Sequence, residues 1–365
     1  MPHEAIFSRR TFLGASLAAG SAAAVGATPG PPAGKPPDGP APIRYWDNHA
    51  GFGYTGPQDM DLLEHWRTAG VHYLSVNVGF DLVPWSDTLL AIADFTQGIA
   101  ARPTLARCST LADVHAAWAA DKLAVTFNIE GMGALNGKLS MVEMYQRLGV
   151  RTMLIAYNAN NAAGGGCHDD DQGLTDFGRA VIKEMNRVGM VVDCAHSGIC
   201  SGLEAMRLSS KPCVFSHANA RALFDHERNI TDEQIKAVAA TGGVVGVNGL
   251  NIFLGEGPAT PERVVAHIDH IAKLVGVAHV GIALDYDPSQ WTPPPPEQLT
   301  KEEQALFEKY WPVRQYPREW KDHYLGPSAL PEIVRQLRAL RYSEDDLRAI
   351  TGGNFMRVAS QVWAS

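Results

Sequence analysis

The sequence predicts an α/β fold of the (β/α)8 barrel type, with a metal site at the C-terminal ends of the strands. From residue 43 onward, short apolar runs rich in Val, Ile and Leu alternate with helical patterns. Such runs are typical of parallel strands that are buried on both faces. Several of these runs also end in a side chain that can bind a metal. We expect eight strands, at about residues 43–48, 72–78, 122–129, 150–156, 189–195, 211–216, 242–248 and 279–284.

Helical segments separate most of the predicted strands. The clearest is expected at residues 176–188, where Thr175 can cap the N-terminus and Gly189 ends the helix. Its apolar residues have helical spacing and are Phe177, Val181, Ile182, Met185 and Val188. Eight strand–helix units within residues 43–365 favour one barrel domain.

Two segments interrupt the alternation. Residues 164–173, rich in glycine and aspartate, follow the fourth strand and should lie on the face where barrel enzymes keep their chemistry. Residues 286–328, the second segment, contain four consecutive prolines together with many aromatic and charged residues. We interpret this segment as an insertion after the eighth strand, which could cap the site or mediate contact between two copies in a homodimer.

The N-terminus predicts a twin-arginine export signal over residues 1–27. Residues 8–14 read Ser-Arg-Arg-Thr-Phe-Leu-Gly, an Ala/Gly-rich apolar stretch follows, and residues 25–27 offer a small-x-small cleavage site. That stretch is too short and too rich in Ala and Gly for a membrane span. We therefore expect the twin-arginine machinery as a partner, a periplasmic or extracellular location, and no membrane span in the mature protein. Residues 28–42 are Pro/Gly-rich and predict an extended linker.

The composition excludes several classes of function. Hydrophobic residues make up 45% and charged residues 19% of the 365, as is typical of a globular chain with a sizeable core. The net charge of -8, with no basic run, argues against a nucleic-acid partner. The five cysteines contain no Cys-x-x-Cys pair and do not suggest a disulfide framework. Cys167, followed by His-Asp-Asp-Asp, is the one cysteine with a setting that suggests a role.

Metal-competent side chains end five of the apolar runs. They are His49, Glu130, His196, His217 and Asp285. A single histidine at a strand end is more often structural than a ligand, but the shared position of all five favours a metal site. The C-terminal ends of parallel barrel strands meet on one face, and imidazoles with carboxylates are the ligands that zinc prefers. A bound metal would also offset the cost of burying an unpaired carboxylate.

A family resemblance rests on seven segments. They are residues 47–49 (Asp-Asn-His), 129–131 (Ile-Glu-Gly), 192–196 (Val-Asp-Cys-Ala-His), 215–217 (Phe-Ser-His), 226–230 (His-Glu-Arg-Asn-Ile), 280–285 (Val-Gly-Ile-Ala-Leu-Asp) and 352–358 (Gly-Gly-Asn-Phe-Met-Arg-Val). In order and spacing they resemble the membrane (renal) dipeptidase family. That family belongs to the amidohydrolase superfamily of metal-dependent (β/α)8 hydrolases. The resemblance extends from about residue 43 to residue 358.

The resemblance implies a site for two zinc ions. Glu130 is similar to the carboxylate that bridges both metals in the family. His196 and His217 match the ligands of one zinc, and His49 matches a ligand of the other. Two cations would lower the pKa of a bridging water and supply a metal-bound hydroxide as the nucleophile.

Three further residues acquire roles from the resemblance. Asp285 matches the aspartate that takes the proton of that water and passes it to the leaving amine. Arg228 matches the arginine that holds the free carboxylate of the substrate, for which its forked donors are suited. Tyr157 stands where many members have a histidine that contacts the substrate carbonyl. Its phenol can still donate a hydrogen bond there, although simple packing at the barrel rim is the alternative.

One metal position departs from the family pattern. The first family motif is Asp-x-His-x-Asp, and its last aspartate is a metal ligand; this chain has Gly51 there. The metal bound through His49 should therefore be held more weakly or recruit another ligand. Asp47 and the loop at residues 167–171 are the nearest candidate sources.

The favoured function is a zinc-dependent hydrolase of dipeptides or dipeptide-like amides, with one or two zinc ions and Asp285 as the proton shuttle. One alternative is a related enzyme with a single metal that acts on another amide, a lactone or a specialised metabolite. Another is a non-catalytic binding protein that lost turnover together with the metal ligand at Gly51. Four retained residues argue against this last alternative, because a pure binder has little reason to keep costly buried charges. They are Glu130, His196, His217 and Asp285.

Overall fold

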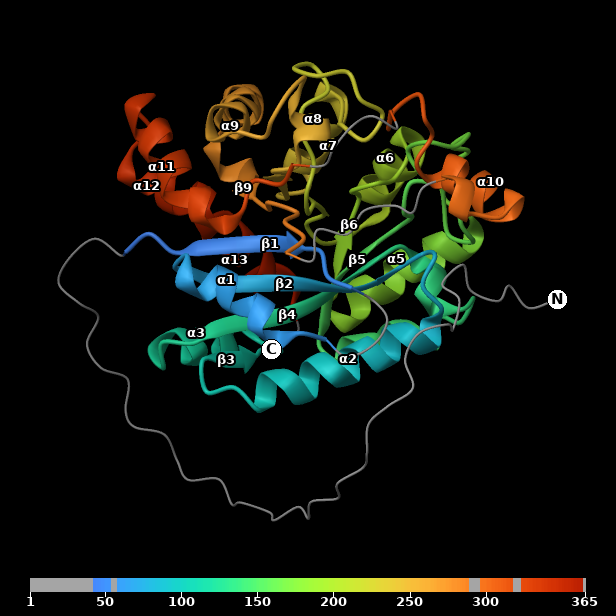
Figure 1. The fold of residues 1–365 in the computed structure, drawn as a ribbon, viewed down its shortest axis with the longest axis horizontal. Coiled ribbons are helices and arrows are strands. Elements are labelled where there is room, and N and C mark those ends of the chain that lie inside the picture. The colour runs from blue at the N-terminus through green and yellow to red at the C-terminus, as the bar shows by residue number, and fades with distance from the viewer. Residues whose placement is uncertain (1–41, 54–57, 289–295, 318–322, 364–365) are drawn as a thin grey trace, which may run out of the picture. The chain divides into compact units, whose positions relative to one another are not determined.

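The predicted (β/α)8 barrel is confirmed. The structure is a computed structural model that describes residues 42–53, 58–288, 296–317 and 323–363. The predicted export signal and nearly all of the predicted linker lie outside these residues. Eight parallel strands follow one another in the order β1-β2-β4-β5-β6-β7-β8-β9 (Figure 1). Their bounds are β1 (Tyr45–Ala50), β2 (Val71–Phe80), β4 (Leu123–Glu130), β5 (Val150–Leu154), β6 (Val191–Asp193), β7 (Val214–Phe215), β8 (Val244–Val247) and β9 (Val280–Ile282).

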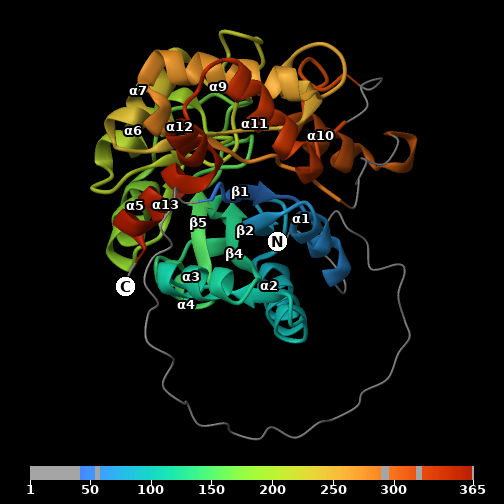
Figure 2. The ribbon, with the colours of Figure 1, turned by 90° about the vertical axis from the view of Figure 1, so that its left-hand side faces the viewer.

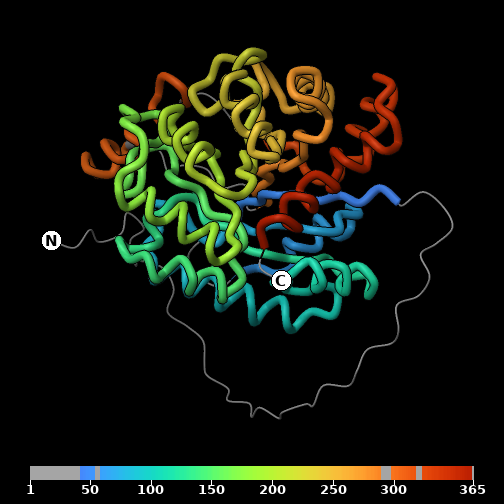
Figure 3. The backbone as a smooth tube through the Cα atoms, turned by 180° about the vertical axis from the view of Figure 1, so that it is seen from behind, coloured from blue at the N-terminus to red at the C-terminus, as the bar shows by residue number. Residues whose placement is uncertain are grey.

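Helices surround the strands. In Figure 2 the strands β1, β2, β4 and β5 lie between α7, α9 and α11 on one side and α2, α3 and α4 on the other. From behind, the helices follow one another around the strands in chain order (Figure 3). Their bounds are α1 (Glu64–Thr68), α2 (Trp85–Ala100), α3 (Leu111–Ala119), α4 (Ser140–Arg147), α5 (Asp176–Val188), α6 (Ile199–Leu208), α7 (Asp232–Ala240), α8 (Asn251–Leu254), α9 (Pro261–Val275), α10 (Lys301–Tyr310), α11 (Leu330–Ala339), α12 (Glu344–Arg348) and α13 (Asn354–Val362). None of the helices in the described ranges combines the length and the apolar character that crossing a membrane requires.

Helix α5 confirms the expectation for residues 176–188. The Thr175 side chain accepts a hydrogen bond from the backbone N–H of Gly178, so it is the N-cap. Gly189 has φ 76° and ends the helix in the left-handed conformation that glycine adopts without cost.

The first and last strands meet only at their C-terminal ends. Ala50 forms a parallel bridge with Tyr286, and the N–H of Gly51 donates to the Tyr286 carbonyl at 3.2 Å. The N–H of Asp285 donates to the His49 carbonyl, also at 3.2 Å. Backbone hydrogen bonds at and next to His49 and Asp285 therefore close the barrel. They fix the distance between these two metal-competent residues.

The observed strands differ from the predicted ranges in their bounds, most of all β6 and β7; the range predicted at 211–216 is only β7, Val214–Phe215. The strand predicted for residues 189–195 is β6, Val191–Asp193, and the chain then leaves the ladder. The Asp193 carboxylate causes this turn, because its Oδ1 accepts from the N–H groups of Ala195 and Ser216 at 2.9 and 3.0 Å. Strand β3 (Leu105–Arg107), which was not predicted, pairs with β4 outside the barrel order.

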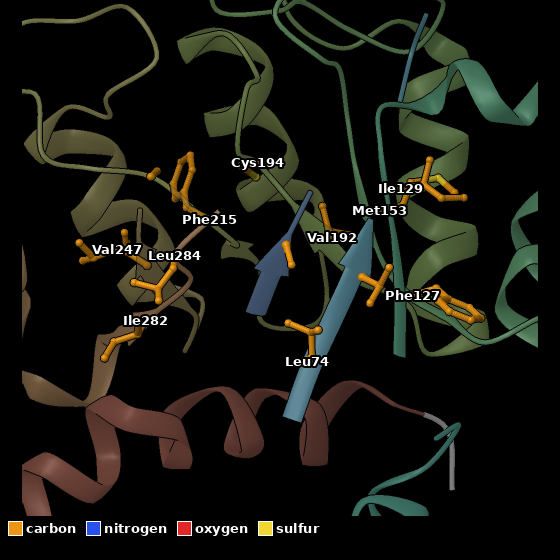
Figure 4. Close-up of a cluster of buried hydrophobic side chains, with 14 of the residues drawn as sticks. Leu74, Phe127, Ile129, Met153, Val192, Cys194, Phe215, Val247, Ile282 and Leu284 are labelled. Carbon is orange, nitrogen blue, oxygen red and sulfur yellow. The ribbon is translucent and has the colours of Figure 1, made fainter. Parts of the chain in front are cut away.

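The hydrophobic core contains residues from all eight barrel strands, with Ala50 as the contribution of β1. Figure 4 shows buried side chains from successive strands packed together, among them Leu74, Phe127, Ile129, Met153, Val192, Phe215, Val247 and Ile282. Close packing of this kind makes the strands a rigid support, because side chains in a dense core have few alternative positions. The groups that follow the strand ends are thereby held at fixed distances.

The described part of residues 286–328 lies against loops that follow the strands. Helix α10 ends at Tyr310, whose carbonyl accepts a hydrogen bond from the Asn158 side chain at 2.9 Å. Beyond α10, Arg314 pairs with Glu227 at 2.9 Å. The segment is thus attached to the loops after β5 and β7, on the side of the barrel where the strands end (Figure 1).

Candidate metal centre

Four side chains that the sequence selects as metal ligands converge at the strand ends. The Nε2 atoms of His196 and His217 lie 2.9 Å apart. Oε1 of Glu130 lies 3.2 Å from Nε2 of His196 and 3.3 Å from Nε2 of His217. The same oxygen is 3.5 Å from Nε2 of His49. All four side chains are buried, so their donor atoms face one another rather than bulk water.

The donor atoms form two overlapping groups. One group is Glu130, His196 and His217, and the other is His49, His217 and Asp285; within each, the donor atoms lie within 4.8 Å of one another. His217 is common to both groups. Glu130 is also close to His49 of the other group. It therefore lies between the two groups, as expected of the bridging carboxylate that the family resemblance implies.

The hydrogen bonds behind two imidazoles orient their free nitrogens. Nδ1 of His196 lies 2.6 Å from Oδ1 of Asn158, and the amide nitrogen of Asn158 donates to the Tyr310 carbonyl. Because Oδ1 can only accept, His196 carries its proton on Nδ1 and presents a lone pair on Nε2 to the centre. Nδ1 of His217 contacts the hydroxyl of Ser216 at 2.7 Å.

Burial sets the charge state of the centre. It lowers the pKa of His49 to about 3 and the pKa of His196 and His217 well below the ordinary value. Burial, reinforced by the Asp285 carboxylate, raises the pKa of Glu130 well above its ordinary value. Neutral imidazoles are the form that binds metal, and a divalent charge would return the carboxylate to its ionised form.

Backbone strain is concentrated around the centre. Six non-glycine residues in the described part of the chain have positive φ, and three of them are Asn158 at 59°, His196 at 59° and Asp285 at 55°. Such conformations cost about 1–3 kcal/mol each and persist where the surrounding structure enforces them. The strained positions are therefore those of the ligand His196, of Asn158 behind it, and of the predicted proton shuttle Asp285.

Arg228 is a buried cation next to the centre. It is 2% exposed, and its Nη2 donates to the His217 carbonyl at 2.7 Å. Its guanidinium carbon lies 5.7 Å from the centre of the Phe253 ring. No acceptor for its Nε is found among the described residues. A buried guanidinium with an unused donor is suited to bind an anionic group.

Tyr157 lies beside the ligand His196. It is held there by the carboxylate of Asp81, a residue that was not selected from the sequence. Its ring stacks on His196 with centroids 4.3 Å apart and an angle of 25°. Its backbone N–H donates to Oδ2 of Asp81 at 2.9 Å, and Oδ1 of Asp81 accepts from the N–H of Gly133 at 2.7 Å. Asp81 thus ties together the loops after β2, β4 and β5. Gly131 leaves room for this carboxylate, since a Cβ there would lie 2.2 Å from Oδ1.

Asp47 does not supply the ligand that Gly51 lacks. Its Oδ2 accepts from the indole N–H of Trp66 at 2.8 Å, and its Oδ1 accepts from the N–H of Leu284 at 2.9 Å. Burial raises its pKa to about 7. Asp47 therefore joins β1 to α1 and to the segment that follows β9, and it belongs to neither donor group.

The loop at residues 167–171 is also engaged elsewhere. Oδ1 of Asp171 accepts from the Ser201 hydroxyl at 2.6 Å, and Oδ2 of Asp169 accepts from the N–H of Asn160 at 3.1 Å. Cys167 contacts Oδ1 of Asn158 at 3.5 Å, and burial raises its pKa to about 12. The Cys167 thiol therefore contacts the side chain behind His196 and belongs to neither donor group.

A parallel barrel whose strand ends gather imidazoles and carboxylates in this way has the architecture of an amidohydrolase-type metal centre. The chain belongs to the membrane dipeptidase family, peptidase family M19, because the model of that family matches residues 81–304.

Named relatives agree with this membership. The uncharacterized dipeptidase C3A11.10c of Schizosaccharomyces pombe is 36% identical over 179 residues, which are 47% of this chain and 44% of the relative. The dipeptidase aclJ of Aspergillus oryzae is 26% identical over 266 residues, 71% of this chain and 56% of the relative. The chain thus spans about half the length of the curated relatives it matches. A crystal structure of an amidohydrolase from Pseudomonas aeruginosa superposes with a TM-score of 0.78 at 25% identity, covering 88% of this chain and 97% of that one.

Replacing Asn158 with alanine is expected to weaken metal binding about 10–100-fold, the usual effect of removing a partner behind a ligand. His196 would lose the acceptor that fixes its tautomer and ring orientation. Competition with a chromophoric chelator measures the affinity. Asn186→Ala is the matched control, because the Asn186 side chain bonds to Ser209, away from the centre. Equal metal affinity in the Asn158 variant and the unmodified protein would remove Asn158 from the site.

Proposed function

We propose that the protein is a zinc-dependent hydrolase of dipeptides or dipeptide-like amides. The observation that supports this most strongly is the convergence of three imidazole Nε2 atoms on one oxygen of Glu130, within 3.5 Å. Membership of the membrane dipeptidase family supports the substrate class, as do the names of the curated relatives.

The donor set fits a divalent metal, and zinc in particular. His49, His196 and His217 offer neutral nitrogens, and Glu130 and Asp285 offer oxygens. This mixture suits zinc better than magnesium or calcium, which prefer all-oxygen sites. When bound, the metal would polarise the scissile carbonyl and lower the pKa of the attacking water.

In this proposal, three residues handle the substrate and the proton. Asn248 donates to Oδ2 of Asp285 at 2.8 Å, which leaves Oδ1 facing His49 at 3.5 Å. Asp285 can therefore accept the proton of the attacking water and return it to the leaving amine. Arg228, with its unused Nε donor, would hold the substrate carboxylate. Tyr157, stacked on His196, would donate its phenolic hydrogen to the carbonyl oxygen.

Hydrolysis of L,L- and L,D-dipeptides by the zinc-loaded protein tests this proposal. Release of free amino acids should be lost after treatment with a chelator and should return when zinc is added back. An intact zinc-loaded protein that cleaves no dipeptide in such a panel would refute the dipeptidase assignment.

The metal position next to Gly51 is expected to be the weaker of the two. The possible substitutes Asp47 and the 167–171 loop are both engaged elsewhere. Stepwise dialysis against a chelator should therefore remove about one metal well before the other. Two metals that leave together would contradict this expectation.

Gly51→Asp is expected to strengthen that weaker position. A Cβ at residue 51 would lie 3.3 Å from Cβ of Asp287, so the neighbour must move by only a few tenths of an ångström. An added carboxylate ligand should raise the affinity of this position for a divalent metal. The cost of desolvating that carboxylate reduces the gain. Gly53→Asp is the matched control, because the space around a Cβ there is open among the described residues. Unchanged release of the second metal from Gly51→Asp would contradict the missing-ligand interpretation.

We also propose that the protein is exported by the twin-arginine route to the periplasm or the cell exterior. Support comes from the Arg9-Arg10 pair and the apolar stretch that follows it. Changing both arginines to lysine should retain the protein in the cytoplasm, as measured by cell fractionation. Arg147→Lys, an exposed change within the barrel domain, is the control. Normal export of the double variant would refute the proposed route.

A further inference from the structure

Five aromatic side chains form a cluster beside the metal centre. They come from the end of β2, the loop after β5, and helix α10 with the residue that follows it; they are Phe80, Tyr157, Phe307, Tyr310 and Trp311. The Tyr157 ring lies edge-on to Phe80 at 5.0 Å and to Trp311 at 5.9 Å. Trp311 in turn lies 5.1 Å from Phe307 and 5.9 Å from Tyr310.

The aromatic cluster adjoins one side of the metal centre. Tyr157 stacks directly on the ligand His196. Phe80 pairs with Glu130 in the ladder between β2 and β4. Tyr157 and Trp311 are only half-buried, whereas Phe80 and Tyr310 are buried behind them. Tyr157 and Trp311 therefore keep part of their surface exposed, and Tyr157 links this surface to the ligand His196.

Arg228 lies on another side of the same centre. It follows β7, whereas the aromatic cluster is built on the ends of β2 and β5, so β6 lies between Arg228 and the nearer of these two strands in the strand order. In the proposed function, Arg228 would hold the carboxylate of the C-terminal residue, and the scissile carbonyl would lie at the residues that hold the metal. The residue that would reach the aromatic cluster is then the N-terminal one.

We propose that the aromatic cluster binds the side chain of the N-terminal residue of the substrate and selects an aromatic or large aliphatic side chain there. This inference rests on the proposed dipeptidase function. Exposed ring faces and edges attract aromatic and aliphatic groups, which gain both buried apolar area and favourable ring geometry. Trp311 is the specificity-determining residue, because it contributes the largest half-exposed ring in the cluster.

Steady-state kinetics with matched dipeptides tests the selection. The kcat/KM for L-Phe-L-Ala should exceed that for L-Ala-L-Ala at least tenfold, the scale on which apolar subsites discriminate. Trp311→Ala should lower this ratio at least tenfold, and Trp311→Phe should keep most of it. Val313→Ala, a change of an exposed apolar residue in the same segment, is the control and should not alter the ratio. A ratio near one in the unmodified protein, or a ratio that Trp311→Ala leaves unchanged, would show that the cluster only packs α10 against the barrel.

A binding measurement separates this inference from the proposed function. Phosphinate analogues of Phe-Ala and Ala-Phe have the same side chains in reversed order and need no turnover. Titration calorimetry with the zinc-loaded protein should show at least tenfold tighter binding of the Phe-Ala analogue. Tighter binding without any dipeptide hydrolysis would refute the function and retain the aromatic subsite. Equal binding of the two analogues, or binding of neither, would overturn the subsite whether or not hydrolysis occurs.

Discussion

His217→Ala is expected to remove bound metal from both positions and to abolish turnover. His217 belongs to both donor groups, whereas His49 and His196 each belong to one. Loss of a partner behind a ligand already costs about 10–100-fold in metal affinity. Loss of the ligand itself, from a site where His217 Nε2 lies 3.3 Å from Glu130 Oε1, should cost more than that. His49→Ala, in contrast, should lose about one metal and retain the position held by Glu130 and His196.

Elemental analysis after gel filtration measures the effect of both changes. His115→Ala is the matched control, because His115 is exposed on α3 and lies outside both donor groups. Circular dichroism and thermal unfolding show whether the variants remain folded. Full metal occupancy in a folded His217→Ala protein would exclude His217 as a shared ligand.

Asp285→Asn is expected to keep the metal and to lower kcat by roughly 10² or more, the usual scale for the loss of general acid–base catalysis. The amide oxygen of asparagine can still accept the hydrogen bond from Asn248. An amide cannot take a proton from the attacking water. This variant therefore separates the effect on metal binding from the effect on proton transfer. Metal content and the kcat for one dipeptide are measured on the same sample.

The control for this change is Asp225→Asn, which removes an exposed carboxylate in the loop before Arg228. Near-normal kcat in Asp285→Asn would remove Asp285 from proton transfer. Loss of metal together with activity would instead identify Asp285 as a ligand, in agreement with its place beside His49 in the second donor group.

The sequence was sufficient to predict the barrel because its strands are continuous apolar runs, which carry their signal locally. It was also sufficient to locate the converging side chains, since each follows such a run. Strand β3 escaped prediction because it has three residues, of which only Leu105 is buried. The Asp193 carboxylate ends β6 early by accepting hydrogen bonds from the backbone. The hydrophobic pattern of the sequence gives no sign of such bonds.

The residues that support the site could not be predicted in the same way. Asn158 acts on a ligand 38 positions further along the chain, and its role depends on a positive φ. Asp81 acts on Tyr157, 76 positions further along. The aromatic cluster combines the end of β2 with helix α10, and the sequence identified the latter only as part of an insertion. Each of these contacts arises from the closed barrel, which brings distant loops together.

Anomalous diffraction from crystals of the zinc-loaded protein, recorded on both sides of the zinc absorption edge, tests the metal centre most directly. We expect a zinc peak among Oε1 of Glu130 and the Nε2 atoms of His196 and His217, and a second, weaker peak beside His49. Crystals that show zinc elsewhere, or none within reach of these atoms, would contradict the proposed metal centre and the hydrolytic function that depends on it.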